Sequence, residues 1–258
     1  MSFFNKKEIK IELIKFLKIY KNRPIKDNKD GMKINHMFAF YFLLKRYKPK
    51  YVIESGIFRG QGTWLIEKTL PNTKIFSIDI DLKNRKYISK KVKYLHKDFK
   101  YFNEKLDPNK TLAFFDDHTC HMERLKQCMI LNLKKIIFED NYQIGQGDFN
   151  SLKYILNQKN FIHKTGILSH FKTLVIFTIE IMKKIFLSNY IINIDKINFR
   201  LRDRVNYKNR IFLKQIKKIF EFPKILSFID DKKLKNKIIK EYSNELDDYN
   251  SFTYIELK

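Results

Sequence analysis

Short apolar runs alternate with segments of helical periodicity over residues 51 to 157. Short, mostly apolar runs predict strands, and apolar positions that recur every three or four residues predict helices. The predicted strands are Tyr51–Glu54, Lys74–Ile78, Val92–Leu95, Thr111–Phe115 and Lys134–Phe138. The predicted helices are Gln61–Thr69, Leu82–Ser89, Tyr101–Leu106, Thr119–Leu131 and Phe149–Leu156. Strands separated by helices in this way predict a parallel sheet covered on both faces.

Helical segments are expected on both sides of this core. Before it, amphipathic patterns predict helices over Lys6–Tyr20 and Asn35–Arg46. After it, residues 158 to 220 have a largely helical pattern that ends at a Phe222-Pro223 break. The β-rich content of Ser251–Leu257 predicts a last strand at an edge of the sheet.

The predicted fold class is therefore α/β, a Rossmann-like doubly wound, mostly parallel sheet with N-terminal helices and a helical C-terminal addition. Four parts are expected: an N-terminal helical cap (1–50), the sheet core (51–157), a helical lid or oligomerisation insertion (158–240) and a final edge strand (241–258). No internal repeat or low-complexity linker separates these parts, so a single domain with appended helices is the simplest description.

Size and cysteine content favour a cytoplasmic protein. A chain of 258 residues with 44% hydrophobic residues can bury a substantial core without disulfides. Cys120 and Cys128 are the only cysteines, and their spacing predicts free thiols in a reducing compartment. The first ten residues lack the apolar core of a signal peptide, and the longest apolar run, Thr173–Met182, contains Glu180. We therefore expect no membrane span, although peripheral contact with the inner membrane surface remains open.

The net charge of +25 is concentrated in the two flanks. Residues 1–50 carry 14 Lys and Arg against 4 Asp and Glu, residues 196–240 carry 15 against 4, and residues 51–150 carry 17 against 13. Basic flanks around a nearly neutral centre can hold nucleic acid, an anionic membrane surface or an anionic glycan. The alternative is a solvated basic surface that reflects a biased genome composition.

Glycines gather at two turns on one edge of the predicted sheet. The chain has seven glycines. Gly56, Gly60 and Gly62 fall in the turn after the first strand, and Gly145 and Gly147 follow the fifth. Ligands of open α/β sheets bind at the carboxyl ends of the strands, and glycine lets the backbone approach them closely. The sequence therefore predicts a ligand at this edge.

The first turn reads E-S-G-x-x-x-G, and the second strand is followed by Asp79. An acid at the end of strand one, a glycine turn and an acid at the end of strand two resemble the motifs of class I S-adenosylmethionine-dependent methyltransferases. The resemblance covers about residues 50 to 157 and implies a cofactor-binding core there. It places cofactor contacts at Glu54 (ammonium), Gly56 and Gly60 (methionine part), Asp79 (ribose) and Asp98 (adenine). Thr63 is a further candidate, because it stands at the start of the next helix, whose positive end favours the cofactor carboxylate. The alternative is that these residues serve helix packing and capping.

A second group of polar residues follows strands four and five. "DDHTCH" supplies Asp116, Asp117, His118 and His121, and "EDNY" supplies Glu139, Asp140 and Asn141. Adjacent parallel strands should bring the two acidic ends together, and clustered carboxylates repel one another unless a cation lies between them. Oxygen ligands with one amide favour a hard divalent ion such as Mg²⁺.

This second group is similar to that of metal-dependent O-methyltransferases, in particular the macrocin and cephalosporin types that act on sugars or small molecules. The resemblance implies Asp116 and Asp140 as metal ligands, with Glu139 and Asn141 competing for a third place. Asp117 remains an alternative to Asp116, because the strand register is uncertain by one residue. His118 is the candidate general base, since a neutral imidazole accepts a proton near neutral pH; a supporting role beside the metal carboxylates is the alternative.

The expected function is S-adenosylmethionine-dependent, metal-assisted O-methylation of a sugar, glycan or small polyhydroxylated molecule. Two alternatives stay open: an RNA methyltransferase that uses the basic flanks, and a cofactor-binding protein without catalysis. Clustered carboxylates favour the enzyme, because a pure binding module gains nothing from their repulsion.

Overall fold

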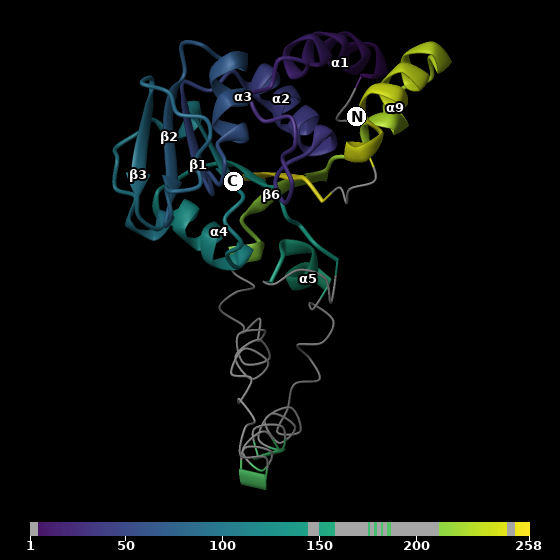
Figure 1. Cartoon of the computed structure of the whole chain (residues 1–258). Coiled ribbons are helices and arrows are strands. Elements are labelled where there is room, and N and C mark those ends of the chain that lie inside the picture. The colour runs from purple at the N-terminus through teal and green to yellow at the C-terminus, as the bar shows by residue number, and fades with distance from the viewer. Residues whose placement is uncertain are drawn as a thin grey trace. The chain divides into compact units, whose positions relative to one another are not determined.

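The computed structural model describes residues 5–143, 150–157, 212–246 and 251–258, with six isolated positions between 175 and 186. The described residues form a seven-stranded sheet (Figure 1). Its strands are β1 (Tyr51–Ser55), β2 (Lys74–Asp79), β3 (Val92–His96), β4 (Thr111–Phe115), β5 (Lys135–Phe138), β6 (Ile216–Glu221) and β7 (Thr253–Leu257). The described helices are α1 (Lys6–Tyr20), α2 (Ile34–Tyr47), α3 (Gln61–Thr69), α4 (His121–Ile130), α5 (Leu152–Asn157) and α9 (Lys232–Leu246). Single 3₁₀ turns are η1 (Phe99–Tyr101), η2 (Pro108–Lys110) and η5 (Ile225–Phe228).

The strand order places a topological switch between β1 and β4. Across the sheet the order is β3-β2-β1-β4-β5-β7-β6. Strands β1 to β5 are parallel, whereas β7 is antiparallel to both β5 and β6. From β1 the chain winds outward through β2 to β3, then crosses back to β4 and winds the other way. The carboxyl ends of β1 and β4 therefore flank the position where such sheets bind ligands.

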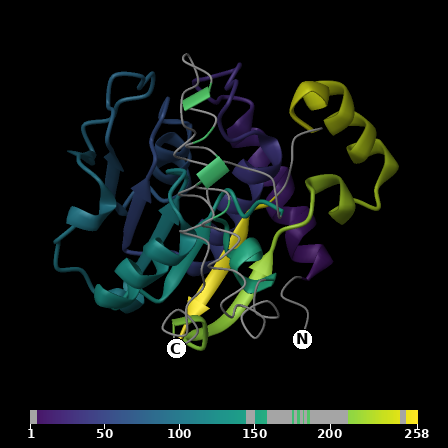
Figure 2. The same cartoon turned by 90° about the horizontal axis from the view of Figure 1, so that it is seen from below.

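Alternating side chains bury both faces of the sheet. On one face Phe114 of β4 stacks on Phe40 of α2, with ring centroids 4.2 Å apart, inside an apolar cluster that includes α1, α3 and α9. On the other face Phe115 meets Phe99 of η1 at 4.8 Å, and the guanidinium of Arg124 from α4 lies 5.9 Å from the Phe115 ring. Figure 2 shows the purple N-terminal helices and the teal α4 on opposite sides of the sheet. The doubly wound α/β fold predicted from the sequence is confirmed.

Two predicted helices are absent from the core. Residues 82–89 form turns and irregular structure, because the Asp81 carboxylate accepts the Lys83 N–H at 2.8 Å in place of a helical partner. The N–H groups of Lys86 and Tyr87 both donate to the carbonyl oxygen of Arg59. The helix expected over residues 101–106 is reduced to η1, which Asp98 caps through the Lys100 N–H at 2.7 Å.

The last strand is present but does not lie at the edge. β7 lies between β5 and β6, and β6 supplies the edge from inside the segment expected to be helical. Its two adjacent lysines, Lys217 and Lys218, are exposed beside a register shift in the pairing with β7, and both features are common in edge strands. The remaining question about residues 158–240, a lid or an oligomer contact, falls mostly outside the described residues.

Residues 119–123 belong to a second unit, together with the described residues between 142 and 215. In its described part, His121 accepts the Leu152 N–H on Nδ1 at 3.0 Å, so His121 caps the first residue of α5. The backbone N–H of His121 donates to the Asn150 carbonyl at 3.1 Å. His121 thus has a structural role. Gly145, Gly147 and the loop around them lie outside the described residues.

No described helix is both long enough and apolar enough to cross a bilayer.

Candidate active site

Gly56 is the point where the ends of β1 and β4 touch. Ser55 pairs with Phe115 in the sheet, so Gly56 comes directly beside Asp116. Gly56 has φ +90°, and a Cβ built on it would lie 1.9 Å from the Asp116 carbonyl oxygen. Gly60 also has a positive φ, +88°, at the N-cap of α3. Only glycine fits the Gly56 position, because both the backbone angle and the contact exclude a side chain.

Replacing Gly56 with alanine is expected to lower the free energy of unfolding by about 3 kcal/mol or more, since the contact is with backbone that cannot swing aside. Gly31→Ala is the matched control, because the nearest atoms to a Cβ there belong to the Asn28 side chain and φ is not positive. Urea unfolding of both variants measures the difference. Equal losses in the two variants would show that the Gly56 contact carries no special strain.

Glu54 is a buried carboxylate at the end of β1. Its side chain is 1% exposed, and Oε2 accepts hydrogen bonds from Thr63 Oγ1 at 2.5 Å and Ser77 Oγ at 2.6 Å. Burial raises the pKa of Glu54 to about 7, although the Ser77 and Thr63 hydroxyls partly offset this rise. The other oxygen, Oε1, accepts no hydrogen bond from any residue that the structure describes. A buried acceptor in this state is expected to have a donor supplied from outside the chain.

Two further acceptors share one pocket with Glu54. The pocket lies at the glycine turn and includes Asn28, Glu54, Gly56, Gln61, Gly62 and Asp116 in its lining. Asn28 Oδ1 and Gln61 Oε1 are buried and accept no hydrogen bond within the described structure, like Glu54 Oε1. A Cβ on Gly62 would lie 2.4 Å from Glu54 Oε1, so this glycine leaves room for the carboxylate. The three oxygens therefore lack N–H donors, and the free volume beside them is about 10 Å³, the size of a single small group such as an ammonium.

The connection between α1 and α2 closes one side of this pocket. Gln61 Nε2 donates to the Ile25 carbonyl at 3.3 Å, and Arg59 Nη1 donates to the Asp27 carbonyl at 3.1 Å. Asn28 is held by its own Nδ2, which donates to the Met32 carbonyl at 3.1 Å. The N-terminal cap predicted from the sequence thus contributes a polar wall, which its amphipathic pattern alone did not indicate.

The raised pKa of Glu54 predicts a stability difference that depends on pH. The unfolded pKa is near 4.5 and the folded value about 7, so the folded chain retains a proton that the unfolded chain has lost. The stability contribution is complete below the unfolded pKa and disappears as pH rises through the folded pKa. Between about pH 5.5 and about pH 7.5, unfolding free energy should fall by roughly 2 kcal/mol more in the wild type than in Glu54→Gln. Urea unfolding at both pH values measures this, and parallel curves would contradict the assignment.

Asp79 orders the glycine turn from the end of β2. Its Oδ2 accepts the Ile57 N–H at 2.7 Å and the Phe58 N–H at 3.2 Å, and its Oδ1 accepts the Asp81 N–H at 2.9 Å. Asp79, the acid predicted to bind a ribose, therefore lies at the expected edge of the sheet. Its carboxylate already accepts hydrogen bonds from the backbone of the glycine turn.

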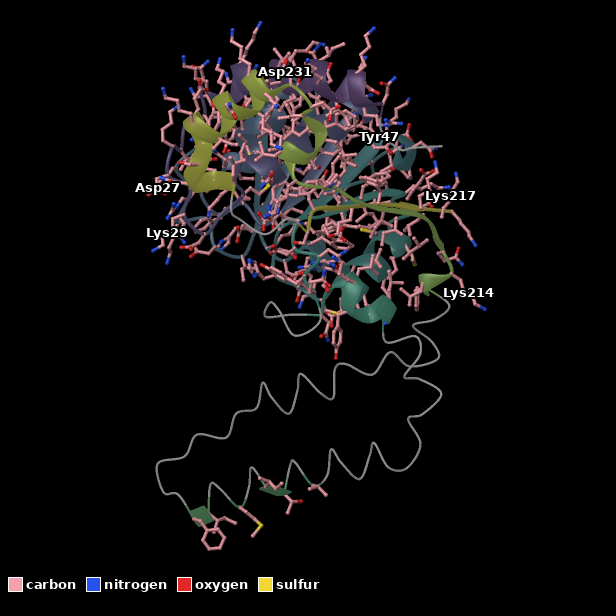
Figure 3. All side chains as sticks on the ribbon, turned by 90° about the vertical axis from the view of Figure 1, so that its right-hand side faces the viewer. Asp27, Lys29, Tyr47, Lys214, Lys217 and Asp231 are labelled. Atoms are coloured by element: carbon pink, nitrogen blue, oxygen red, sulfur yellow. The ribbon has the colours of Figure 1, made fainter. Side chains whose placement is uncertain are left out.

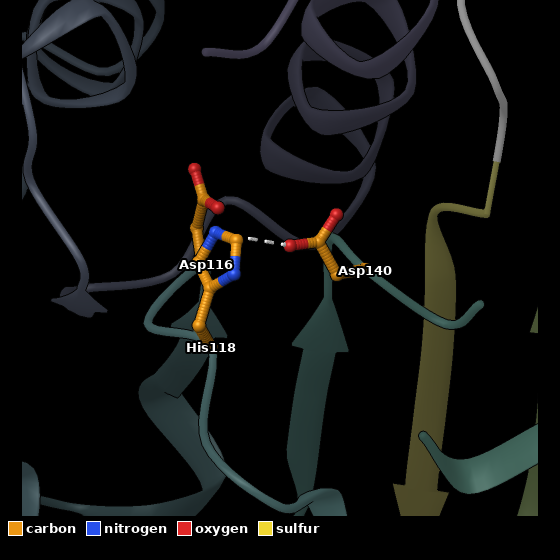
Figure 4. A group of neighbouring side chains, drawn as sticks. All are labelled: Asp116, His118 and Asp140. Carbon is orange, nitrogen blue, oxygen red and sulfur yellow. Dashed lines mark ion pairs between the residues drawn. The ribbon is translucent and has the colours of Figure 1, made fainter. Parts of the chain in front are cut away.

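Three polar side chains meet beyond β4 and β5. One ligand atom from each of Asp116, His118 and Asp140 lies within 4.8 Å of the others (Figure 4). His118 Nε2 is 3.6 Å from Asp140 Oδ2, and the two side chains are 53% and 3% exposed. Burial, reinforced by the charges of Glu139 and Asp140, raises the pKa of Asp116 well above its usual range. Two carboxylates and an imidazole at this spacing are a donor set that fits a divalent cation.

His118 stands in the left-handed backbone region, with φ +51°. This conformation is uncommon for a residue with a side chain, and such residues concentrate at functional sites. Here it turns the imidazole toward Asp140, as Figure 4 shows. The exposed imidazole is thereby available to a molecule that reaches the carboxylates.

Arg124 separates the roles of the two adjacent aspartates. Its Nε donates to Asp117 Oδ2 at 2.9 Å, and its Nη1 donates to Asp98 Oδ1 at 3.0 Å. Ser55 Oγ also donates to Asp117 Oδ2. Asp117 and Asp98 are thus bound to a buried guanidinium, whereas Asp116 joins the group with Asp140. Asp116 and not Asp117 is therefore the member of the cluster, and its role as a metal ligand stays a prediction.

Glu139 and Asn141 make other contacts. Glu139 pairs with His36 of α2, and both side chains are buried. Asn141 Nδ2 donates to Thr253 Oγ1 of β7 at 2.9 Å. The structure therefore brings Asp116, Asp140 and His118 together but turns the two proposed third ligands toward α2 and β7.

Sequence reasoning missed several polar residues of the site. They are Asn28, His36, Ser55, Gln61, Ser77 and Arg124. Ser55 and Ser77 were detectable, because each stands in a strand that ends at the predicted ligand edge. Asn28, His36 and Arg124 come from elements whose placement the periodicity does not determine.

Comparison with known proteins gives a loose likeness in fold. No protein-family model matches the sequence, and no curated protein matches it. An O-methyltransferase from Bacillus cereus in complex with SAH is similar at 11% identity and a TM-score of 0.45, over 100% of this chain and 94% of that one. The SAH-bound methyltransferase PaMTH1 from Podospora anserina has 12% identity and a TM-score of 0.44, over 96% and 88%.

A structure of cmcI with SAH has 15% identity and a TM-score of 0.36. The match covers 43% of this chain and 62% of that chain. At these identities and TM-scores the likeness carries no argument about activity. The case for a function rests on the geometry of the site.

Proposed function

We propose that this protein is an S-adenosylmethionine-dependent O-methyltransferase. The observation that carries the proposal is the Glu54 pocket beside the glycine turn, where a buried carboxylate oxygen and two amide oxygens accept no hydrogen bond from the described residues. S-adenosylmethionine presents an ammonium group with three N–H donors and a sulfonium. Its amino-acid end therefore supplies both the donors and the charge that this pocket lacks.

The remaining cofactor contacts follow the carboxyl edge of the sheet. Gly56 and Gly60 are the proposed contacts of the methionine part, and Thr63 fixes the Glu54 carboxylate from α3. Asp79, at the end of β2, is the ribose acceptor in this proposal, and Asp98, beyond β3, stands at the adenine end. Strands β1, β2 and β3 are neighbours in that order, so the three parts of an extended cofactor would cross them in sequence.

Asp116 and Asp140 are the proposed ligands of a divalent ion, with Mg²⁺ as the candidate. Such an ion, when bound, lowers the pKa of an acceptor hydroxyl and fixes its position. The chain's own contribution is to hold two carboxylates close enough that a cation relieves their repulsion. The pKa of Asp116 is raised first by burial and then by the charges of Glu139 and Asp140. Asp116 also lines the Glu54 pocket, so the cation and the cofactor sites would be adjacent.

His118 is the proposed general base. Its Nε2 lies 3.6 Å from Asp140 Oδ2, so the imidazole is held beside the proposed metal ligands. Its exposure lets an acceptor hydroxyl approach from solvent. The acceptor we propose is a hydroxyl of a sugar, glycan or small polyhydroxylated molecule.

Methyl transfer from labelled S-adenosylmethionine to panels of sugars, phenols and single-stranded RNA tests this function. We expect transfer to a hydroxylated small molecule that needs a divalent ion and stops with a chelator. Transfer that persists in chelator would remove the metal from the mechanism. Transfer to RNA alone would show that the acceptor is RNA and not a small hydroxylated molecule.

A further inference from the structure

The two basic flanks of the sequence meet along helices α1 and α9. Lys10 of α1 pairs with Asp231, the residue before α9, at 3.2 Å, and the rings of Tyr20 and Tyr242 lie 5.7 Å apart. Each helix carries five lysines and two glutamates. Figure 3 shows nitrogen-ended side chains standing out from this side of the molecule around Asp231. Charges that are separated by more than two hundred residues in the sequence thus form one surface.

An apolar groove runs between these helices. It has a volume of about 300 Å³ and is lined by Ile14, Leu17, Lys18, Lys21, Leu234, Lys237, Ile238, Glu241 and Tyr242. Ile14 is 41% exposed, and Ile11, one turn earlier on α1, is 47% exposed. Exposed isoleucines beside a groove of this size indicate a binding surface, because contact with an apolar partner would remove them from water.

Carboxylates of the described residues offset little of the positive charge at the groove. Within that part of the chain, Lys18 and Lys21 form no ion pair, and Lys237 Nζ lies 3.9 Å from Glu241 Oε1. Two acids of these helices are used elsewhere: Glu12 bonds Lys15 and Tyr41, and Glu245 bonds Arg23. The groove therefore combines an apolar floor with a lysine rim.

We propose that the α1–α9 face, defined by the groove residues and the exposed lysines of both helices, docks on an anionic lipid bilayer. Lysines attract the headgroups, and exposed isoleucines enter the boundary with the acyl chains. The lysines extend along both helices, which suits a planar charged surface better than a single small anion. RNA is the less fitting partner, because the only aromatic side chain of the groove, Tyr242, is buried and offers no face for base stacking.

Co-sedimentation of the full chain with vesicles tests this surface without reference to methyl transfer. We expect binding to phosphatidylcholine vesicles that contain phosphatidylglycerol, weakened by added salt, and little binding to phosphatidylcholine alone. The double variant Lys18→Glu, Lys21→Glu should weaken binding at least about tenfold. The matched control is Lys90→Glu, Lys91→Glu, which changes net charge equally at exposed positions before β3. Ile14→Gln should also weaken binding, and more of its effect should survive added salt.

Several results would overturn the proposal. They are the absence of binding to phosphatidylglycerol vesicles, equal losses in the two double variants, and an Ile14→Gln variant that binds like the wild type. Binding of single-stranded RNA that depends on Lys18 and Lys21, with no vesicle binding, would assign the surface to nucleic acid. Circular dichroism confirms folding, and Lys18→Ala, Lys21→Ala replaces the reversed pair if that pair unfolds.

Discussion

Replacing Asp140 with alanine is expected to lower the rate of methyl transfer by at least about a thousandfold, which corresponds to several kcal/mol of transition-state stabilisation. Asp140 is buried at 3% exposure, faces His118 and adds to the negative charge that raises the pKa of Asp116. Without it, the cluster loses one of its two carboxylates and the imidazole loses its charged neighbour. Folding and binding of S-adenosylhomocysteine should persist, because the Glu54 pocket does not include Asp140.

The neighbouring aspartates provide the control for this result. Asp116→Asn should abolish turnover as Asp140→Ala does. Asp117→Asn should instead lower stability, since buried Arg124 would keep only Asp98 as a charged partner of the two seen here. Divalent-ion affinity by calorimetry and urea unfolding separate the two effects. If Asp117→Asn lost ion binding while Asp116→Asn kept it, the assignment of the cluster would be wrong.

Glu54→Gln is expected to weaken S-adenosylmethionine binding by about a hundredfold, the size of effect seen when one partner of a buried charge pair is truncated. The glutamine carbonyl can still accept from Thr63 and Ser77, so the local fold should survive. What the variant lacks is the negative charge opposite the ligand ammonium. Calorimetry at about pH 8, where the wild-type carboxylate with its pKa of about 7 is ionised, measures the loss.

The pH dependence of binding distinguishes charge from shape in this pocket. Wild-type affinity should fall between about pH 8 and about pH 6, because Glu54 must release a proton before it can pair with the ammonium. Glu54→Gln should lack most of this slope. Glu67→Gln is the matched control on α3, where the carboxylate bonds Tyr87 outside the pocket. If Glu54→Gln kept the wild-type dependence of affinity on pH, the titrating group would be a residue other than Glu54.

The core of the fold was predictable because its patterns are local. Residues 51–55 and 111–115 are short, mostly apolar runs that form buried strands, and 61–69 has helical periodicity from its glycine turn onward. The glycines and acids at the strand ends were also readable, since parallel strands bring their carboxyl ends to one edge. That logic predicts that Glu54, Gly56, Asp116 and Asp140 lie near one another.

What the sequence did not reveal depends on contacts between distant segments. The Glu139 side chain meets His36 from a helix about a hundred residues earlier, and nothing in "EDNY" indicates this partner. Asn28 enters the pocket because the segment before α2 folds over the glycine turn. β6 is an edge strand rich in lysine, so its pattern is weak, and its place is fixed only by pairing with β7.

Calorimetric titration of the protein with S-adenosylhomocysteine, alongside NADH and with Mg²⁺ or chelator present, tests the central claim most directly. We expect micromolar binding of S-adenosylhomocysteine in both conditions, no binding of NADH, and loss of most of the affinity in Glu54→Gln. Absence of S-adenosylhomocysteine binding by the folded protein would contradict the account, because the unsatisfied oxygens at the glycine turn would then belong to a different ligand.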